Sequence, residues 1–406
     1  MKRRSLLAVF LISAIWLGVA GPRGLSAQLA PLGPEAQLPA NGGAERPDLA
    51  VQPGGGYVVA WDDLSARVFA HYIAAGGEAP GEDTVFVGDG GPPATDSVTT
   101  TAKGFEVLWH VTNQDGEPVA FYRRHLDPQG RPAPGRPVLL ARGGIDWVWD
   151  LGGTRYLSGW FMDRKQTIGA RFLSPSGQPT GPVMRLSSRP IDDPEALAVP
   201  LADGGFVAVW FGTRLDKAEA VAGKEEEGSG TDVLRARRFN AAGQPLGPDF
   251  DVNTTSAGAG ETAPFLNPQF QVAAAPDGGF AVSWALDQTI YVRYFDAAGR
   301  PLTPEVKAVS DPSVFAPVSM AFDDQGNLLL LWLQYLDNPD LQIQRLDPSG
   351  APVGPSQMIR SSASADFQAP LEGSVTWAGD SWLVTWVAVD PSAGSRAVFV
   401  RRFARE

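Results

Sequence analysis

Aspartate residues follow closely behind seven tryptophans that recur along the chain, and their carboxylates are the groups best suited to ligand chemistry. The candidates for a ligand-binding role are Asp62, Asp63, Asp115, Asp163, Asp287, Asp337 and Asp390. Carboxylates that converge from several loops can hold a hard cation such as Ca²⁺, or form an acidic rim for a basic or sugar ligand. Aspartate is also a common turn residue, so a conformational role stays open, and we expect weak Ca²⁺ binding at most.

Two tryptophans in the segment GGIDWVWDLGG (143–153) form a second candidate site. Trp147 and Trp149 are two positions apart, so on a strand they share one face. That face could stack against a sugar ring, or it could pack against a neighbouring sheet. The sequence leaves both interpretations open.

Other groups that could carry out catalysis are sparse. The three histidines, His71, His110 and His125, have no metal-ligand spacing, which favours structural or surface roles. The chain has no cysteine, no Gly-x-Ser-x-Gly, no His-Glu-x-x-His and no phosphate-binding loop. An enzyme that uses two carboxylates from distant loops is not excluded, because such pairs have no local signature.

The elements that must position these residues are strands in a regular repeat. Tryptophan ends a strand-like segment at Trp61, Trp109, Trp160, Trp210, Trp284, Trp332 and Trp386, with intervals of 48, 51, 50, 74, 48 and 54 residues. The residues two and four positions before each tryptophan are mostly apolar, which is the alternation of a half-buried strand. A period near fifty with one tryptophan per period is typical of a radially repeated β architecture.

Each repeat predicts four strands: an inner strand, the tryptophan strand, an arginine-bearing strand and an outer strand. Arg124, Arg171, Arg237, Arg293 and Arg401 occupy the same position of the third strand, which indicates a repeated structural contact. The turns before each tryptophan strand and after each third strand are uniform, whereas the connections that follow the tryptophans vary in length. The segment 212–232 is an insertion that explains the interval of 74, and variable loops on a rigid scaffold are where binding usually resides.

The two ends of the chain complement each other. The last repeat stops after a third strand at 397–406, and residues 30–39 read like the fourth strand of another repeat, PLGPDFDVN (245–253). The N-terminal segment is therefore expected to complete the last sheet and close the ring, which removes exposed sheet edges. The sequence predicts an all-β, seven-bladed β-propeller of four-stranded antiparallel blades.

The repeat units DGGFVAVW (203–210), ARRFNAAGQPLG (236–247) and DFDVN (249–253) resemble those of bacterial exported β-propeller repeat proteins. The resemblance covers nearly all of residues 30–406 and implies the propeller architecture. It implies no particular activity, because propellers host binding proteins, scaffolds and enzymes alike.

The first residues predict export. Lys2, Arg3 and Arg4 precede an apolar run at 6–20 and a small-residue stretch, which together are typical of a signal peptide over residues 1–27, cleaved after Ala20 or Ala27. Removing 1–27 leaves 29 basic and 45 acidic residues, a net charge of −16. Such a charge disfavours nucleic acid and anionic lipid as partners. We expect a secreted or periplasmic propeller over 28–406.

Three kinds of function fit these observations. The first is a non-enzymatic binding or interaction module that holds a glycan, peptide or protein on the irregular-loop face, as a monomer and without a cofactor. The second is a polysaccharide hydrolase or lyase that uses loop carboxylates. The third is a purely structural cell-surface protein.

Overall fold

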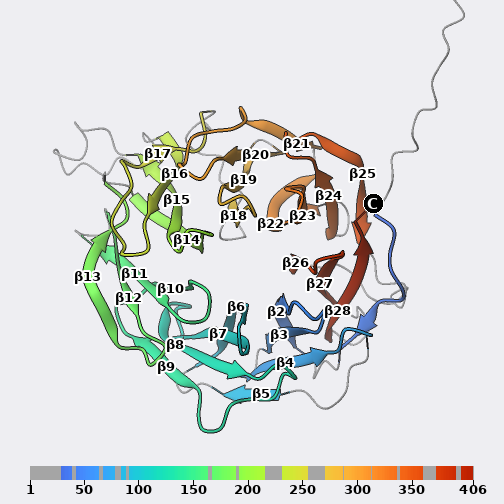
Figure 1. Ribbon diagram of the computed structural model, residues 1–406, viewed down its shortest axis with the longest axis horizontal. Coiled ribbons are helices and arrows are strands. Elements are labelled where there is room, and N and C mark those ends of the chain that lie inside the picture. The colour runs from blue at the N-terminus through green and yellow to red at the C-terminus, as the bar shows by residue number, and fades with distance from the viewer. Residues whose placement is uncertain are drawn as a thin grey trace, which may run out of the picture.

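The protein is a closed ring of seven antiparallel β-sheets around a central axis, as shown by the computed structural model (Figure 1). The residues that the structure describes are 29–38, 43–63, 67–77, 84–87, 91–162, 167–188, 192–214, 231–254, 270–286, 288–311, 313–335, 339–359, 372–389 and 395–405. The proposed signal peptide and most of the 212–232 insertion lie outside these residues. None of the described segments forms a helix of the length and hydrophobicity that a membrane crossing requires.

The first three blades follow one another in chain order. Blade 1 consists of β2 (Ala44–Val51), β3 (Tyr57–Asp63), β4 (Arg67–Ile73) and β5 (Thr84–Val87). Blade 2 consists of β6 (Pro93–Thr101), β7 (Gly104–Thr112), β8 (Pro118–Leu126) and β9 (Val138–Arg142). Blade 3 consists of β10 (Trp147–Asp150), β11 (Tyr156–Met162), β12 (Thr167–Leu173) and β13 (Pro179–Arg185).

The remaining blades repeat the same order, and the last one borrows a strand. Blade 4 consists of β14 (Asp192–Pro200), β15 (Phe206–Arg214), β16 (Thr231–Phe239) and β17 (Phe250–Asp251). Blade 5 consists of β18 (Phe270–Ala274), β19 (Phe280–Leu286), β20 (Thr289–Phe295) and β21 (Val306–Ser310). Blade 6 consists of β22 (Val314–Phe322), β23 (Leu328–Tyr335), β24 (Pro339–Leu346) and β25 (Pro352–Ile359). Blade 7 consists of β26 (Gly373–Trp377), β27 (Ser381–Val389), β28 (Arg396–Ala404) and the N-terminal β1 (Ala36–Gln37).

The seven repeating tryptophans all lie on the second strand of a blade, as the spacing predicts. Six of them are almost completely buried, which fits a side chain pressed between sheets. Trp160 is the exception, because it is only partly buried. It lies opposite Gly169 on the next strand, and a Cβ added at Gly169 would come within 2.9 Å of the indole ring. The ring of Trp160 therefore packs over the neighbouring strand of its own blade.

Apolar residues gather in seven clusters, and each cluster spans two neighbouring blades. The cluster between blades 2 and 3 is the smallest of those in the described residues, and it contains Leu108, Phe121 and Val148. Buried polar groups lie at the same interface: the Glu106 carboxylate accepts hydrogen bonds from Arg123 at 2.8 Å and pairs with His125 at 2.9 Å.

Third-strand arginines tie blades 2 to 5 to their own outer segments. Arg237 donates from Nε to the carbonyl of Gly247 at 2.9 Å, and Arg171 does the same to Gly181 at 2.9 Å. Arg293 also donates to the carbonyl of Val252 in the preceding blade at 2.8 Å. The recurrence of these arginines therefore has a structural cause.

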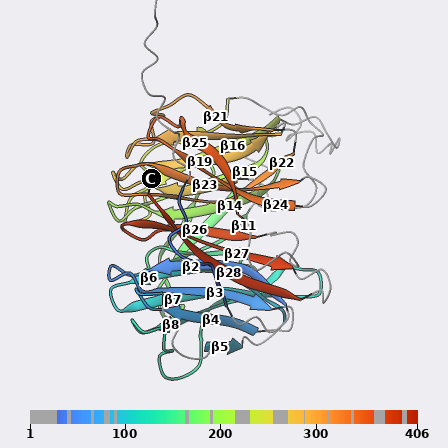
Figure 2. The same ribbon diagram turned by 90° about the vertical axis from the view of Figure 1, so that its right-hand side faces the viewer.

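The N-terminal segment closes the ring, as the sequence predicts. Strand β1 pairs antiparallel with β28, with Ala36 opposite Val400, and the Leu38 amide donates to the carbonyl of Val398 at 2.9 Å. Figure 2 shows the last strand, β28, beside strands β2 and β3 near the start of the described chain.

Two leucines of this segment allow closure to be tested. Leu38 is 2 % exposed and Leu32 is 49 % exposed. Leu38→Ala should lower the free energy of unfolding by about 2–5 kcal/mol, because it deletes a buried side chain at the seam. Leu32→Ala should change it by about 0.5 kcal/mol or less. Urea unfolding of both variants measures the difference, and equal losses would show that β1 does not carry the closure.

Candidate functional site

A cavity of about 520 Å³ lies beside the inner strands of blades 2 to 5, along the central channel. These strands, β6, β10, β14 and β18, surround the central opening in Figure 1. We call one face of the ring the loop face. It is the face at which the second strand of each blade ends and the inner strand begins. The cavity begins near that face at Asp96 and Trp147 and extends along the channel as far as Asp150 and Pro200.

An aromatic wall forms one side of the cavity. The rings of Trp147 and Trp149 stack with centroids 5.8 Å apart, and Phe161 meets Trp147 edge-on at 5.0 Å. Gly159 makes room for this pair, because a Cβ there would come within 2.7 Å of Trp149. Trp149 is buried in the core between blades 3 and 4, whereas Trp147 is only partly buried. Both rings therefore pack against this core and both line the cavity, and Trp147 is the more exposed of the two.

Among the described residues that line the cavity, the only basic group is the imidazole of His110, which pairs with Asp96. Its Nδ1 lies 2.6 Å from a carboxylate oxygen of Asp96, and its ring lies against Phe121 with centroids 5.4 Å apart. Burial by itself would lower the pKa of His110, but the charge and hydrogen bond of Asp96 outweigh it and raise that pKa above the ordinary value of 6.5. The contact with Asp96 therefore favours the protonated form of the imidazole.

Three further carboxylates line the cavity. Asp146 accepts a hydrogen bond from the Phe161 amide at 2.9 Å, and Glu195 lies on β14. Asp150 accepts a hydrogen bond from the Gly153 amide through Oδ1, and its carboxylate is also hydrogen-bonded by the Thr99 side chain. Burial raises the pKa of Asp150 from 3.8 to about 6.

An ion-pair network joins blades 7, 1 and 2 on the loop face, and the charges of its Arg46 and Asp62 act on His110. Arg46 binds Asp62 through two contacts, at 3.1 and 2.8 Å, and its amide donates to Glu372 of blade 7. Asp62 also accepts from the Thr95 amide of blade 2 at 2.9 Å. Burial raises the pKa of Asp62 to about 6, although Arg46 opposes the shift. This network holds neighbouring blades together.

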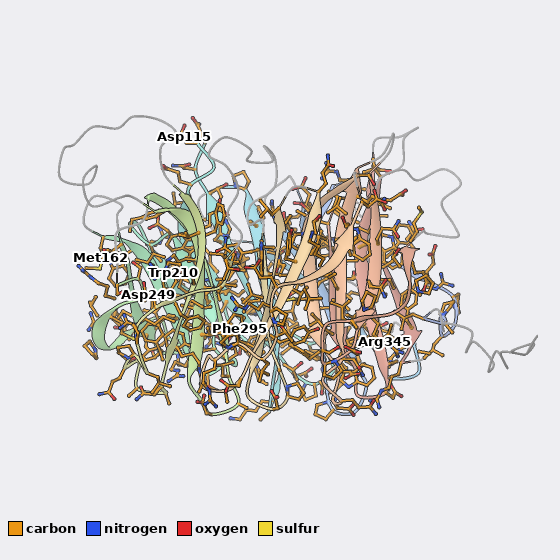
Figure 3. All side chains as sticks on the ribbon, turned by 90° about the horizontal axis from the view of Figure 1, so that it is seen from above. Asp115, Met162, Trp210, Asp249, Phe295 and Arg345 are labelled. Atoms are coloured by element: carbon orange, nitrogen blue, oxygen red, sulfur yellow. The ribbon has the colours of Figure 1, made fainter. Side chains whose placement is uncertain are left out.

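The aspartates predicted from the sequence are placed as follows. Asp62 and Asp63 are not loop residues: they end strand β3, they are buried, and Asp63 pairs with Arg67 at 2.6 Å. Asp115 is exposed in a hairpin that projects beyond the strand ends (Figure 3). Asp163, Asp287, Asp337 and Asp390 lie outside the described residues, so convergence of the full set stays a prediction.

The structure also identifies polar residues that the sequence analysis missed: Asp96, Asp146, Asp150 and Glu195. One feature of the sequence could have identified them. Each is a charged residue on or next to an inner strand, where small or apolar residues prevail. His110 was noted only as a residue without metal spacing. Within the described ranges, no group of three or more His, Asp or Glu side chains could hold a metal ion. Of the aspartates suggested for Ca²⁺, Asp62 and Asp63 are bound to arginines.

Comparison with solved structures supports the fold. The chain is similar to a PL25 ulvan lyase, a polysaccharide lyase solved bound to -[GlcA(1-4)Rha3S]-, with a TM-score of 0.51, 10% identity, and coverage of 91% of this chain and 96% of that chain. It is also similar to the β-propeller domain of the Trilobed protease from Pyrococcus furiosus, with a TM-score of 0.50, 8% identity, and coverage of 90% and 94%. Searches against protein families and curated proteins gave no match. The class defined by these findings is the seven-bladed β-propeller.

The protonation of His110 can be tested by NMR. In Asp96→Asn the negative charge is gone, so the pKa of His110 should fall. The chain has three histidines, and His71 and His125 serve as internal references in a ¹H–¹³C titration. An unchanged midpoint for His110 would show that Asp96 does not control its proton.

The buried Asp150 should leave a mark on the pH dependence of stability. Between about pH 4 and 6 the folded protein keeps a proton on Asp150 that the unfolded chain releases, so the free energy of unfolding falls as pH rises through this window. Asp150→Asn should remove this contribution to the free energy of unfolding, which amounts to about 3 kcal/mol at most across the window. The control is Asp115→Asn, which removes an exposed carboxylate. Urea unfolding across the window compares them, and parallel profiles for Asp150→Asn and wild type would contradict the assignment.

Proposed function

We propose that this protein is a non-enzymatic binding module that acts outside the cytoplasm and holds a glycan in its central channel. The observation that carries the proposal is the cavity of about 520 Å³ beside the partly exposed Trp147. Pockets of about this size with an aromatic wall and a few polar groups suit small ligands and saccharide units. An indole face stacks on the apolar face of a sugar ring, and carboxylates accept hydrogen bonds from hydroxyl groups.

Location outside the cytoplasm is supported by the sequence of residues 1–27, with its basic start and apolar run. The strong negative charge supports neutral or cationic partners rather than nucleic acid. The paired seam between β1 and β28 leaves no open sheet edge there, which supports a monomer. A cavity with an aromatic wall also weighs against a purely structural role.

A second candidate function is cleavage of a polysaccharide in the same channel. The observation that favours it is the contact between His110 and Asp96 at 2.6 Å, because a histidine held by a carboxylate inside a cavity can transfer protons. Incubation of the protein with a bound glycan, followed by chromatography of the products, separates the two candidates. Stable glycan indicates a binding module, and shortened chains indicate an enzyme.

Binding should depend on Trp147. A thermal-shift screen of residues 28–406 against neutral, cationic and anionic oligosaccharides identifies a ligand, which at 100 times its Kd adds about 2.7 kcal/mol of stability. Trp147→Leu should then weaken binding about tenfold, because it removes the stacking face and keeps an apolar side chain in place.

The matched control is Trp160→Leu in the same blade. Trp160 is also partly buried but does not line the cavity, so its loss should leave affinity unchanged. Calorimetric titration measures the affinity of both variants for the identified saccharide. Equal affinities of wild type and Trp147→Leu would place the ligand elsewhere and overturn the proposed channel site.

A further inference from the structure

We propose that a pocket between blades 5 and 6 binds the side chain of an arginine from a partner polypeptide. The pocket lies on the face of the ring opposite the loop face, which we call the turn face. Strand β20 ends on the turn face at Phe295, on the other side of the ring from Asp115 (Figure 3). The pocket shares no lining residue with the channel cavity, so this site lies beyond the proposed glycan function.

At the junction of blades 3 and 4, the protein inserts an arginine of its own. Arg155 directly precedes strand β11 and places its guanidinium group over the ring of Phe172, at 4.4 Å from the ring centroid. The same group donates to the carbonyl oxygen of Gly204 at 2.8 Å and to that of Ala241, which both lie in turns of blade 4. An aromatic ring of one blade and two turn carbonyls of the next blade therefore form a guanidinium site.

Two further junctions place an arginine on the same turn carbonyls. Between blades 2 and 3, Arg123 donates to the carbonyl of Pro175 at 2.6 Å. Between blades 7 and 1, Arg402 donates to the carbonyl of Gly55 at 2.9 Å. Each acceptor has the same turn position in its blade as one of the two acceptors in blade 4, counted from the paired residues at the ends of the second and third strands. The turn face thus repeats a site that suits a guanidinium group.

Between blades 5 and 6, the corresponding residues line a pocket of about 380 Å³. Tyr294 has the position of the aromatic ring beneath Arg155, and Gly326 and Pro348 have the positions of the two carbonyl acceptors. The residue that corresponds to Arg155 itself is Gly279, which has no side chain to insert. The walls of a guanidinium site are therefore present here, and an arginine from another polypeptide can fill it.

The charges beside the pocket favour a cation. Asp277 and Asp324 line it and are exposed, and no lysine or arginine is among the described residues of its wall. Asp277 accepts a hydrogen bond from the Gly279 amide at 2.9 Å, which fixes its carboxylate in the turn. Asp324 is already contacted by Arg405. The attraction that a cationic ligand experiences therefore depends chiefly on Asp277.

The apolar part of the wall favours arginine over a small cation. The rings of Tyr294 and Phe322 meet edge-on with centroids 5.9 Å apart, and Phe322 is partly exposed. Leu302 also lines the pocket and is 60 % exposed, so the pocket opens on the molecular surface. A guanidinium group stacks on aromatic rings, and the methylene groups of arginine cover apolar surface. Lysine has no planar group of this kind.

The test compares two peptides that differ in the charge of one side chain. The first is acetyl-Gly-Gly-Arg-Gly-Gly amide, and in the second an uncharged citrulline replaces the arginine. An NMR titration of ¹⁵N-labelled residues 28–406, which contain the complete ring, should shift the amide signals of Gly279 and Gly326. The arginine peptide should bind at least roughly fivefold more tightly than the citrulline peptide, and this preference should decrease as salt is raised.

Two variants assign the binding to the pocket. Asp277→Asn removes a charge but keeps the oxygen that accepts the turn hydrogen bond, and it should weaken binding of the arginine peptide roughly threefold. Tyr294→Arg supplies an arginine at the position that Arg402 has in blade 7, and it should abolish binding. Asp115→Asn removes an equal charge on the loop face and should leave the affinity unchanged. Melting temperatures of the three variants establish that they are folded.

Four outcomes would count against this assignment. Equal affinities of the two peptides would show that the pocket does not select a guanidinium group. Arginine binding that survives both pocket variants would place it elsewhere, and no response at about 5 mM peptide would remove it altogether. Dimerisation of the wild type that Tyr294→Arg abolishes would assign the pocket to a second copy of the chain instead of a separate partner. None of these results bears on the glycan proposal, because Trp147 lines the other cavity.

Discussion

The packing of sheet against sheet governs this structure. Each blade has two apolar faces, and only the neighbouring blades can cover them, which is why the described core divides into seven clusters that each span two blades. A linear stack would leave two faces exposed to water. The closed ring leaves none, so every blade depends on both neighbours, and the large side chains on the second strands supply much of the buried area.

Closure also requires that the two chain ends meet. Strand β1 supplies the outer strand of blade 7, and on the loop face Arg46 contacts Asp62 within blade 1 and Glu372 in blade 7. The seam is thus held by backbone hydrogen bonds at the outer edge and by charged side chains near the axis. Burial of Asp62 raises its pKa, because the carboxylate gives up hydration that Arg46 only partly replaces.

The same ring geometry creates the candidate site. Inner strands converge on the axis without filling it, so side chains there can be polar without disrupting the cores between blades. The interface between blades 2 and 3 has the smallest apolar cluster and the buried contacts of Glu106 with Arg123 and His125. Asp96, His110 and Asp150 lie on this side of the cavity.

The sequence by itself determined the architecture. The tryptophan interval, the four-strand unit and the offset between the chain ends all follow from local patterns that repeat, and repetition makes each pattern easier to recognise. The tertiary structure alone decided which charged residues meet. Asp62 and Asp63 read as loop residues but end a buried strand, bound to Arg46 and Arg67. Asp96 and His110 are 14 residues apart on paired strands, and Glu195 reaches the same cavity from another blade. A ligand site of this kind depends on side-chain direction across several blades, and that direction is set by ring closure rather than by local sequence.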